Sequence, residues 1–199
     1  WRATWAGEGG GVLLNQCPHN LDILTWLFGM PTRVRAFCAL GKHHPIEVED
    51  EVTAYFEYAN GATGVFVTTT GEAPGTDRLE IAGDRGRLVV EQGRIAFTRN
   101  EISAAQFCRE SPSSFSVPPV WHVDVPVSAG GGSHMKVTQN FVDAILDGVP
   151  LIAPAEEGLL SLELGNAMLF SGLTGKTVEL PLDGAAYERL IRKLVASSR

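Results

Sequence analysis

The feature that most constrains the fold is a run of short alternating segments, separated by tight turns, in the middle of the chain. Arg33–Leu40, Glu51–Tyr58 and Ala62–Thr70 alternate apolar or β-branched residues with polar ones, as half-buried strands do. Asn60-Gly61 joins the last two and strongly favours a hairpin turn. Further strands are expected at Arg78–Ala82, Gly86–Val90 and Arg94–Thr98. Such short connections predict antiparallel pairing, because parallel strands need a crossover of about a dozen residues or more.

Apolar residues at helical spacing flank this strand block on both sides. A first helix is predicted over Asn15–Phe28, with Gly29 ending it. Later elements are expected as helices at Met135–Leu146, Glu156–Leu173 and Ala185–Ala196, with a short strand at Thr177–Leu180. Glu156–Leu173 is apolar nearly all round and is expected to be deeply buried. The order predicts an α+β fold: a large, open, mostly antiparallel mixed sheet with helices packed on one face.

From residue 100 to residue 133 the chain is rich in serine, proline and glycine, and it ends in Gly130-Gly131-Gly132. We expect a long excursion with one short strand near Val120–Val127. Loops of this length are usually functional or mobile.

Composition narrows the possible functions. The 199 residues are 44% hydrophobic, enough for one domain with a sizeable core. The formal net charge of -7 argues against nucleic acid as a partner and against an anionic membrane surface. No apolar run is long enough to span a bilayer. The three cysteines are widely spaced, so neither a disulfide framework nor a structural zinc site is expected, and a cytoplasmic location is predicted.

Two glycine motifs imitate nucleotide-binding turns. Gly7-Glu8-Gly9-Gly10-Gly11 has Val12 where the G-x-G-x-x-G pattern needs its last glycine, and no hydrophobic strand precedes it. Gly175-Lys176-Thr177 runs from helix to strand, the reverse of a P-loop. We therefore expect no cofactor-binding residues and no metal site in this chain. Because it begins Trp1-Arg2 without a methionine, we expect residues 1–199 to be one domain of a longer protein.

The chemically richest segment is the predicted first helix, where Asn15 and His19 are four residues apart and Asp22 is three further on. At this spacing their side chains can share one face of a helix. Histidine suits proton transfer at a carbon-bound oxygen because its pKa lies close to neutrality. Asp22 would hold the imidazole in one tautomer, and Asn15 would hydrogen-bond a hydroxylated ligand. Structural alternatives stay open: Asn15 as a helix N-cap, Asp22 as a solvated residue and His19 as a partly buried histidine.

Other polar residues are weaker candidates. Cys17 lies off the helical face of His19, so a Cys–His nucleophilic pair is not expected. His43-His44 is expected to be solvated in a loop and not metal-bound. The acidic run Glu49-Asp50-Glu51 begins a strand and is expected to be a solvated edge that discourages strand pairing.

Several segments together resemble one family. Gly9–Leu14, followed by Asn15-Gln16-Cys17-Pro18-His19-Asn20-Leu21-Asp22, is similar to the helix that opens the C-terminal domain in the glucose–fructose oxidoreductase, inositol dehydrogenase and rhizopine-catabolism (Gfo/Idh/MocA) family. The resemblance continues through Val48–Ala54, Asn60–Gly64, Asn140–Ile145, Leu151–Gly158 and Val178–Pro181. The order and spacing of these segments are specific to the family.

The resemblance implies a two-domain oxidoreductase of which this chain is the C-terminal, dihydrodipicolinate reductase-like domain. NAD or NADP would be bound mainly by an N-terminal Rossmann domain that the chain lacks. Family substrates are usually sugars, sugar derivatives or cyclitols, and the exposed sheet face commonly forms a homodimer or homotetramer. The family's catalytic histidine falls on His19, and an aspartate four residues earlier falls on Asn15. An amide at that position keeps a hydrogen-bonding group but does not raise the basicity of His19 as a carboxylate would.

We therefore expect His19 to act as general acid/base on a substrate oxygen, with Asn15 positioning a hydroxyl and Asp22 orienting the group. Arg2 is expected to reach the substrate or the cofactor. The chain alone is expected to be inactive, because the cofactor half is missing. The alternative is a non-catalytic assembly or sugar-binding module that dimerises through its sheet, where Thr63, Val65, Val67 and Thr69 share a semi-apolar face.

Overall fold

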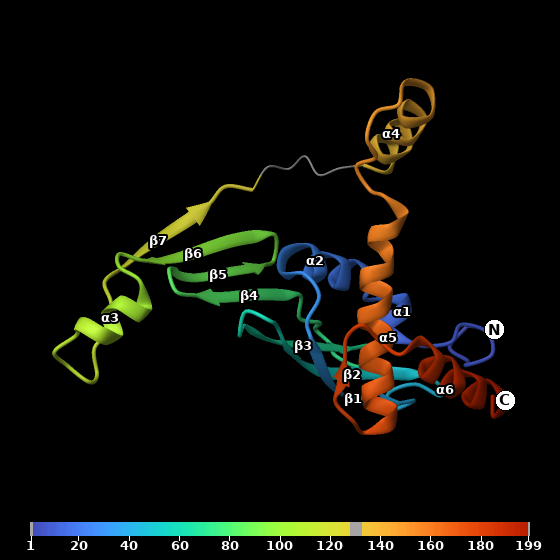
Figure 1. Cartoon of the computed structure of the whole chain (residues 1–199). Helices are drawn as coiled ribbons and strands as arrows, with labels where there is room; N and C mark the ends of the chain where they lie inside the picture. Colours follow the sequence, from blue (N-terminus) through green and yellow to red (C-terminus); the bar gives the residue numbers. More distant parts are fainter. Residues whose placement is uncertain (1, 128–132, 199) are drawn as a thin grey trace. The chain divides into compact units, whose positions relative to one another are not determined.

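The computed structural model describes residues 2–127 and 133–198 and divides the chain into two compact units (Figure 1). Unit 1 comprises Trp1–Glu72 and Asn140–Arg199, and unit 2 comprises Ala73–Gln139. The glycine run expected to end the long excursion, Gly130-Gly131-Gly132, lies outside the described residues. Within the described ranges, no helix is both long enough and apolar enough to cross a membrane.

Unit 1 is built on a four-stranded antiparallel sheet in the order β3-β2-β1-β8. Its strands are β1 (Arg33–Leu40), β2 (Glu49–Glu57), β3 (Thr63–Thr69) and β8 (Val178–Glu179). The predicted hairpin at Asn60-Gly61 is confirmed, with Glu57 opposite Thr63. Gly61 adopts φ 84°, a left-handed conformation that glycine enters without steric cost.

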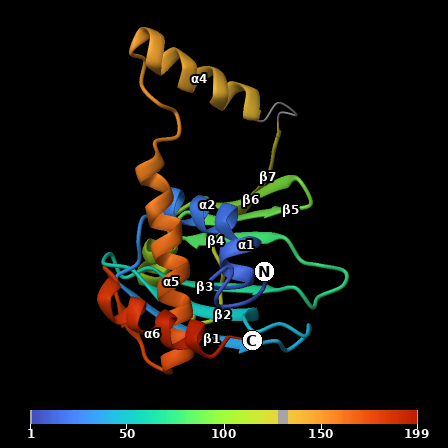
Figure 2. The same cartoon turned by 90° about the vertical axis from the view of Figure 1, so that its right-hand side faces the viewer.

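Alternation along the strands decides which face of this sheet is buried. Helix α5 (Gly158–Thr174) lies against β1, and α6 (Gly184–Ala196) lies beside α5, where the Tyr187 hydroxyl donates to Asn166 Oδ1 at 2.9 Å (Figure 2). The core between sheet and helix consists of fully buried apolar side chains, chiefly Val34, Ala36, Val52, Ala54, Phe56, Leu164, Ala167, Met168 and Leu169. Burial of this apolar surface supplies the main driving force for folding of the unit.

The predicted first helix is broken in two. The structure has α1 (Val12–Asn15) and α2 (Pro18–Phe28), separated by Gln16 and Cys17. Pro18 has no N–H to donate to the carbonyl of Leu14, so the helical hydrogen-bond pattern is interrupted there. The single helix Asn15–Phe28 is therefore wrong at its start, and Asn15 and His19 lie on different helices. Asn15 ends α1 and is not the N-cap of a helix.

The later helices follow the prediction more closely. α4 (His134–Asp147) and α6 differ from the expected bounds by one residue at most, and a 3₁₀ turn, η1 (Ala155–Glu157), precedes α5. The expected deep burial of α5 holds only from Leu164 onward. Leu159 and Leu162 in its first half are 62% and 47% exposed, although the helix is apolar on all sides.

Unit 2 contains a second four-stranded antiparallel sheet, in the order β4-β5-β6-β7. Its strands are β4 (Arg78–Gly83), β5 (Gly86–Glu91), β6 (Arg94–Asn100) and β7 (Val120–Val125). The expected strand near Val120–Val127 is thus confirmed. A helix that the sequence analysis did not predict, α3 (Ala104–Glu110), is capped by Ser103, whose Oγ accepts the Gln106 N–H at 3.0 Å.

The predicted α+β class, with antiparallel strands and helices packed on a sheet face, is confirmed. In the described residues the strands form two four-stranded sheets, whereas one large sheet was expected. The division falls at residue 73, between β3 and β4.

One buried hydroxyl ties α5 to the sheet and gives a test of this packing. Ser171 is fully buried, and its Oγ accepts the Ala36 N–H at 2.9 Å and donates to the Lys176 carbonyl at 2.6 Å. Ser171→Ala leaves both backbone groups without their partner, so we expect a loss of about 2 kcal/mol in the free energy of unfolding, measured with urea. Ser161→Ala on the same helix removes a solvent-exposed hydrogen bond. It should change the free energy of unfolding by less than about 0.5 kcal/mol. Equal losses in the two variants would contradict the bridging role of Ser171.

Candidate functional site

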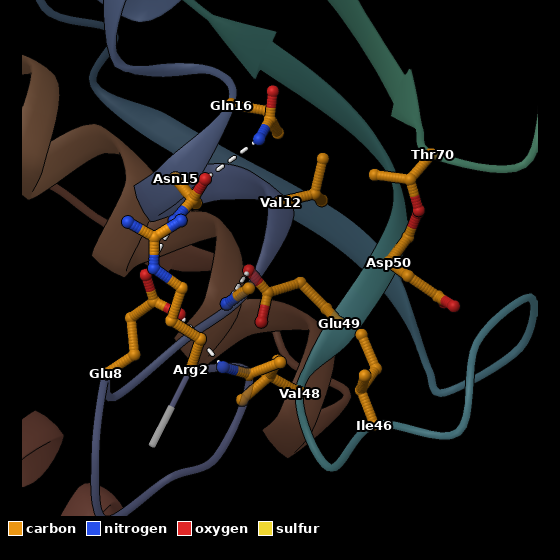
Figure 3. Close-up of a pocket in the computed structure, with 12 residues that line it drawn as sticks. Arg2, Glu8, Val12, Asn15, Gln16, Ile46, Val48, Glu49, Asp50 and Thr70 are labelled. Carbon is orange, nitrogen blue, oxygen red and sulfur yellow. Dashed lines mark hydrogen bonds between the residues drawn. The ribbon is translucent and has the colours of Figure 1, made fainter.

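The first candidate site is a pocket of about 200 Å³ in unit 1, formed by the N-terminal loop, α1 and the start of β2 (Figure 3). Two of the site residues predicted from the sequence, Asn15 and Arg2, line this pocket. The polar residues that line it are Arg2, Glu8, Asn15, Gln16, Glu49, Asp50 and Thr70.

Asn15 is held by hydrogen bonds at both ends of its amide. Its Nδ2 donates to Glu8 Oε1 at 2.6 Å, and its Oδ1 accepts from Gln16 Nε2 at 2.8 Å. The Glu8 carboxylate also accepts the Ala3 N–H at 2.9 Å. The Ala3 N–H first, and then the Asn15 amide, hold the pKa of Glu8 below its usual value. A carboxylate is thus bonded directly to the amide at position 15.

Glu49, at the start of β2, is fully buried beneath this pocket. Its Oε1 accepts the Gly11 N–H at 2.8 Å and the Leu13 N–H at 3.2 Å, while its Oε2 has no hydrogen-bond partner in the described part of the chain. Burial raises the pKa of Glu49 above its ordinary value, against the lowering effect of the backbone N–H groups. The side chain therefore favours its neutral form more than a solvated glutamate does.

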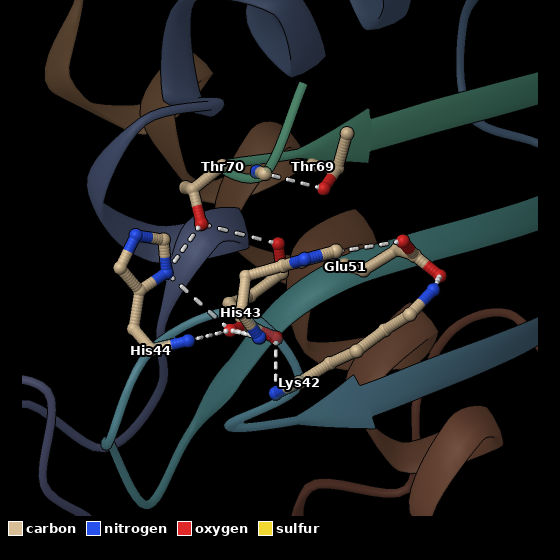
Figure 4. Close-up of polar contacts among 8 residues, drawn as sticks. Lys42, His43, His44, Glu51, Thr69 and Thr70 are labelled. Carbon is tan, nitrogen blue, oxygen red and sulfur yellow. Dashed lines mark hydrogen bonds and ion pairs between the residues drawn. The ribbon is translucent and has the colours of Figure 1, made fainter. Parts of the chain in front are cut away.

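Asp50 is 1% exposed and binds the loop between β1 and β2. Figure 4 labels the loop residues Lys42, His43 and His44. Its Oδ1 accepts the Lys42 N–H at 3.0 Å, and its Oδ2 accepts the N–H groups of His43 and His44 at 2.7 and 3.1 Å. Burial raises the pKa of Asp50, but these three N–H donors outweigh it and leave the pKa lower than usual. Asp50 is therefore a buried anion.

The prediction that Glu49-Asp50-Glu51 forms a solvated edge is wrong for its first two members, which are buried. Only Glu51 faces outward, where it pairs with Lys42 Nζ at 2.6 Å and with His43 Nε2 at 3.1 Å. His44 Nδ1 lies 3.2 Å from the Thr70 hydroxyl. The two histidines thus contact protein groups and are not simply solvated.

The other two predicted residues line a second pocket of unit 1, of about 320 Å³. His19 stands in the first turn of α2 and Asp22 one turn further, and both are exposed. Facing them are Ala153 to Ala155, Glu157, Gly158 and Ser161, which include η1 and the start of α5. No hydrogen bond joins His19 to Asp22 within the described ranges, and the orienting role of Asp22 stays a prediction.

The structure therefore groups the four predicted residues in pairs, Asn15 with Arg2 and His19 with Asp22. The two pockets share no lining residue. The residues that sequence analysis missed are Glu8, Glu49 and Asp50. Among the described residues, no three histidine, cysteine, aspartate or glutamate side chains gather as a metal-binding group.

The chain is similar to a known protein family and to several solved structures. The model of the GFO/IDH/MocA C-terminal domain matches residues 1–89, which confirms the resemblance inferred from the sequence. The solved structure of the WlbA dehydrogenase from Chromobacterium violaceum, in complex with NADH and UDP-GlcNAcA, is 29% identical with a TM-score of 0.70. The match covers 92% of this chain and 49% of that one.

Two further structures share the fold. The WlbA dehydrogenase from Bordetella pertussis, also in complex with NADH and UDP-GlcNAcA, is 22% identical over 92% of this chain and 49% of its own, with a TM-score of 0.61. The aldose-aldose oxidoreductase from Caulobacter crescentus, complexed with glycerol, is 21% identical over 90% of this chain and 50% of its own, with a TM-score of 0.67. The chain thus spans about half the length of each of these proteins.

The role of Asp50 predicts a pH-dependent loss of stability. Because its pKa is lowered in the folded state, its stabilising effect is complete above the unfolded value near 3.8 and is lost as the pH falls through the folded pKa. Asp50→Asn should lower the free energy of unfolding at pH 7 by about 1–3 kcal/mol, because one amide oxygen cannot accept from three separated donors. Urea titrations at pH 7 and pH 3 should show that the difference in free energy of unfolding between wild type and Asp50→Asn is smaller at pH 3. Asp124→Asn, at an exposed position of β7, is the control, and a difference that stayed constant with pH would contradict the assignment.

Proposed function

From the match of residues 1–89 to the GFO/IDH/MocA C-terminal domain, we propose that this chain is the substrate-binding half of an NAD(P)-dependent oxidoreductase. The intact enzyme would interconvert a hydroxyl and a carbonyl on a sugar, sugar derivative or cyclitol. The observation that carries the proposal is the place of His19, which stands exposed in the first turn of α2 at the edge of an open pocket. An accessible imidazole in a concave, partly polar surface is what proton exchange with a bound hydroxyl requires.

The chemistry divides between two groups. In the oxidising direction, the carbinol carbon would give up a hydride to nicotinamide bound by the intact enzyme. His19 takes the hydroxyl proton as neutral imidazole, and it returns that proton to the carbonyl oxygen in the reverse direction. An imidazole can both accept and donate a proton, so the same side chain can serve in both directions.

The glycine turn before α1 does not fit the phosphates of a dinucleotide. A phosphate at a helix N-terminus is bound by free backbone N–H groups. At the start of α1 those of Gly11 and Leu13 already donate to Glu49, and α1 is only four residues long. We therefore assign NAD or NADP to an N-terminal Rossmann domain of the intact enzyme and the substrate side to this chain.

The substrate class is supported by the polar pocket and by the relatives. Asn15 and Gln16 present amides, and Arg2 presents a guanidinium, so the pocket suits hydroxyl and carboxylate groups. The Chromobacterium violaceum relative is solved with UDP-GlcNAcA and the Caulobacter crescentus relative with glycerol, both polyhydroxylated molecules. The proposal requires a substrate that occupies both pockets, so that Asn15 and Arg2 contact it in the first and His19 acts on it in the second, where Asp22 also lines the wall.

Replacing His19 tests the proton-transfer role. In the intact enzyme, His19→Ala should lower kcat/KM for the substrate by roughly 10² or more, because general acid–base catalysis contributes at least this much. Steady-state nicotinamide absorbance at saturating cofactor measures the effect. His122→Ala, at an exposed position of β7, should leave the rate unchanged. A His19→Ala enzyme within about threefold of wild type would show that the histidine does not transfer the proton.

A second function, assembly through the sheet of unit 1, is favoured by the face opposite α5. Phe37, Tyr55, Val65 and Val67 project from three neighbouring strands and are 65%, 42%, 67% and 63% exposed. Arg35 lies over the Phe37 ring at 4.8 Å, and Arg33 pairs with Glu57 at 3.0 Å on the same face. A continuous apolar patch with a charged rim is typical of a protein interface. We infer that this face joins copies of the chain as a homodimer or homotetramer.

Light scattering at increasing protein concentration tests the assembly. The wild-type chain should be an oligomer, and Val67→Glu should shift it toward the monomer, because a buried unpaired carboxylate at the centre of the patch opposes association. Val117→Glu, at an exposed position of unit 2, provides the matched control. A wild-type chain that stayed monomeric at high concentration would contradict the interface.

A further inference from the structure

The start of β2 and the glycine turn before α1 approach each other so closely that only glycine fits between them. A Cβ atom built on Gly11 would lie 2.0 Å from the backbone oxygen of Glu49, and 2.9 Å from a methyl group of Val48. At this contact the Glu49 side chain turns into the α1 turn and accepts two of its N–H groups. Both the backbone and the side chain of Glu49 therefore define where the turn lies.

A short hydrogen-bonded path leads from this carboxyl to Asn15. Glu49 Oε1 accepts the Gly11 N–H at 2.8 Å, and the carbonyl of the same Gly11 accepts the Asn15 N–H at 3.0 Å. The Leu14 N–H also donates to the Gly11 carbonyl, at 3.2 Å. One residue, Gly11, thus connects the buried carboxyl to the backbone of a proposed substrate-binding residue.

Helix α1 is packed through the buried side chains of Val12 and Leu13, but it has no side chain of its own at its N-cap. It is four residues long, and its N-cap, Gly11, offers no side chain to accept its first N–H groups. A single helical turn is unstable alone, because nucleation fixes several residues for one hydrogen bond. Glu49 supplies, from a distant strand, the acceptor that an N-cap side chain normally provides.

We infer that Glu49 is a positioning residue of the substrate site: its buried carboxyl holds the Gly11–Asn15 turn and thereby sets the place of the Asn15 side chain. This inference rests on the proposed function for its effect on catalysis, but the positioning itself is a property of this chain. It assigns a role inside the site to a buried acidic residue.

Three variants separate positioning from general stability. Glu49→Gln keeps a side-chain oxygen for the two N–H groups, Glu49→Ala removes it, and Glu49→Asp withdraws the carboxyl by one methylene. Glu163→Ala is the matched control, because Glu163 Oε1 accepts the Leu182 N–H at 2.8 Å and so also joins a carboxylate to a distant backbone segment. Glu163 lines neither of the two pockets.

Amide hydrogen exchange on the full chain is the first measurement. Glu49→Ala should reduce protection of the Gly11–Asn15 amides by roughly tenfold or more, while Glu49→Gln stays within about threefold of wild type. Glu163→Ala should leave these amides protected. If Glu49→Ala does not fold, Glu49→Asp replaces it, with the same expected local loss. Protection in Glu49→Asp equal to that of wild type, or lost equally in Glu163→Ala, would overturn the inference.

Kinetics of the intact enzyme is the second measurement. Glu49→Ala should lower kcat/KM for the substrate by roughly 10- to 100-fold, since small displacements of positioning groups cost this much, and Glu49→Gln should restore most of it. The KM for NAD(P) should stay within about twofold, because the other domain binds the cofactor mainly. An equal loss in Glu163→Ala would overturn the role. If the enzyme had no oxidoreductase activity, the proposed function would fail, and the exchange result would still decide the positioning.

Discussion

The two adjacent carboxyls at the start of β2 fix the segments that form the first pocket. Glu49 accepts two N–H groups of the α1 turn, and Asp50 accepts three from the β1–β2 loop. Their pKa values shift in opposite directions. Burial outweighs the backbone N–H groups and raises the pKa of Glu49, whereas burial of Asp50 is outweighed by the N–H groups of His43, Lys42 and His44, which lower its pKa.

The same two residues show how far sequence reasoning reaches. Val52, Ala54 and Phe56 face the core, and the period of two places Asp50 on the same side, so its burial could have been predicted. Glu49 should then point outward. It does not, because the pairing of β1 and β2 shifts register between Ala39 and Leu40, so that Asp50 has no direct partner. Such a bulge turns one side chain to the other face of the sheet. The sequence Glu49-Asp50-Glu51 does not indicate that a bulge forms there.

Hydrophobic pattern and turn chemistry predicted most elements because those signals are local. Asn60-Gly61 fixes a hairpin wherever two strands flank it, and the core face of β1 and β2 follows from alternation. Other features depend on more than local pattern. The break before α2 comes from Pro18, which outweighs the apolar spacing that continues across it. Apolar character predicts that a side chain tends to be buried, but it does not predict which element will cover it. Leu159 is therefore exposed although α5 is apolar all round.

The residues around Asn15 explain why an amide, and not a carboxylate, suits position 15. A carboxylate at this position would face Glu8, and two like charges at hydrogen-bond distance repel each other. Asn15 instead donates to Glu8 at 2.6 Å, so the pair keeps one negative charge and gains a fixed amide orientation. That charge lies in the pocket that holds Arg2, whereas His19 lines the other one. The exchange of carboxylate for amide therefore acts on how a ligand is held beside Asn15 and Arg2, in the pocket that His19 does not line.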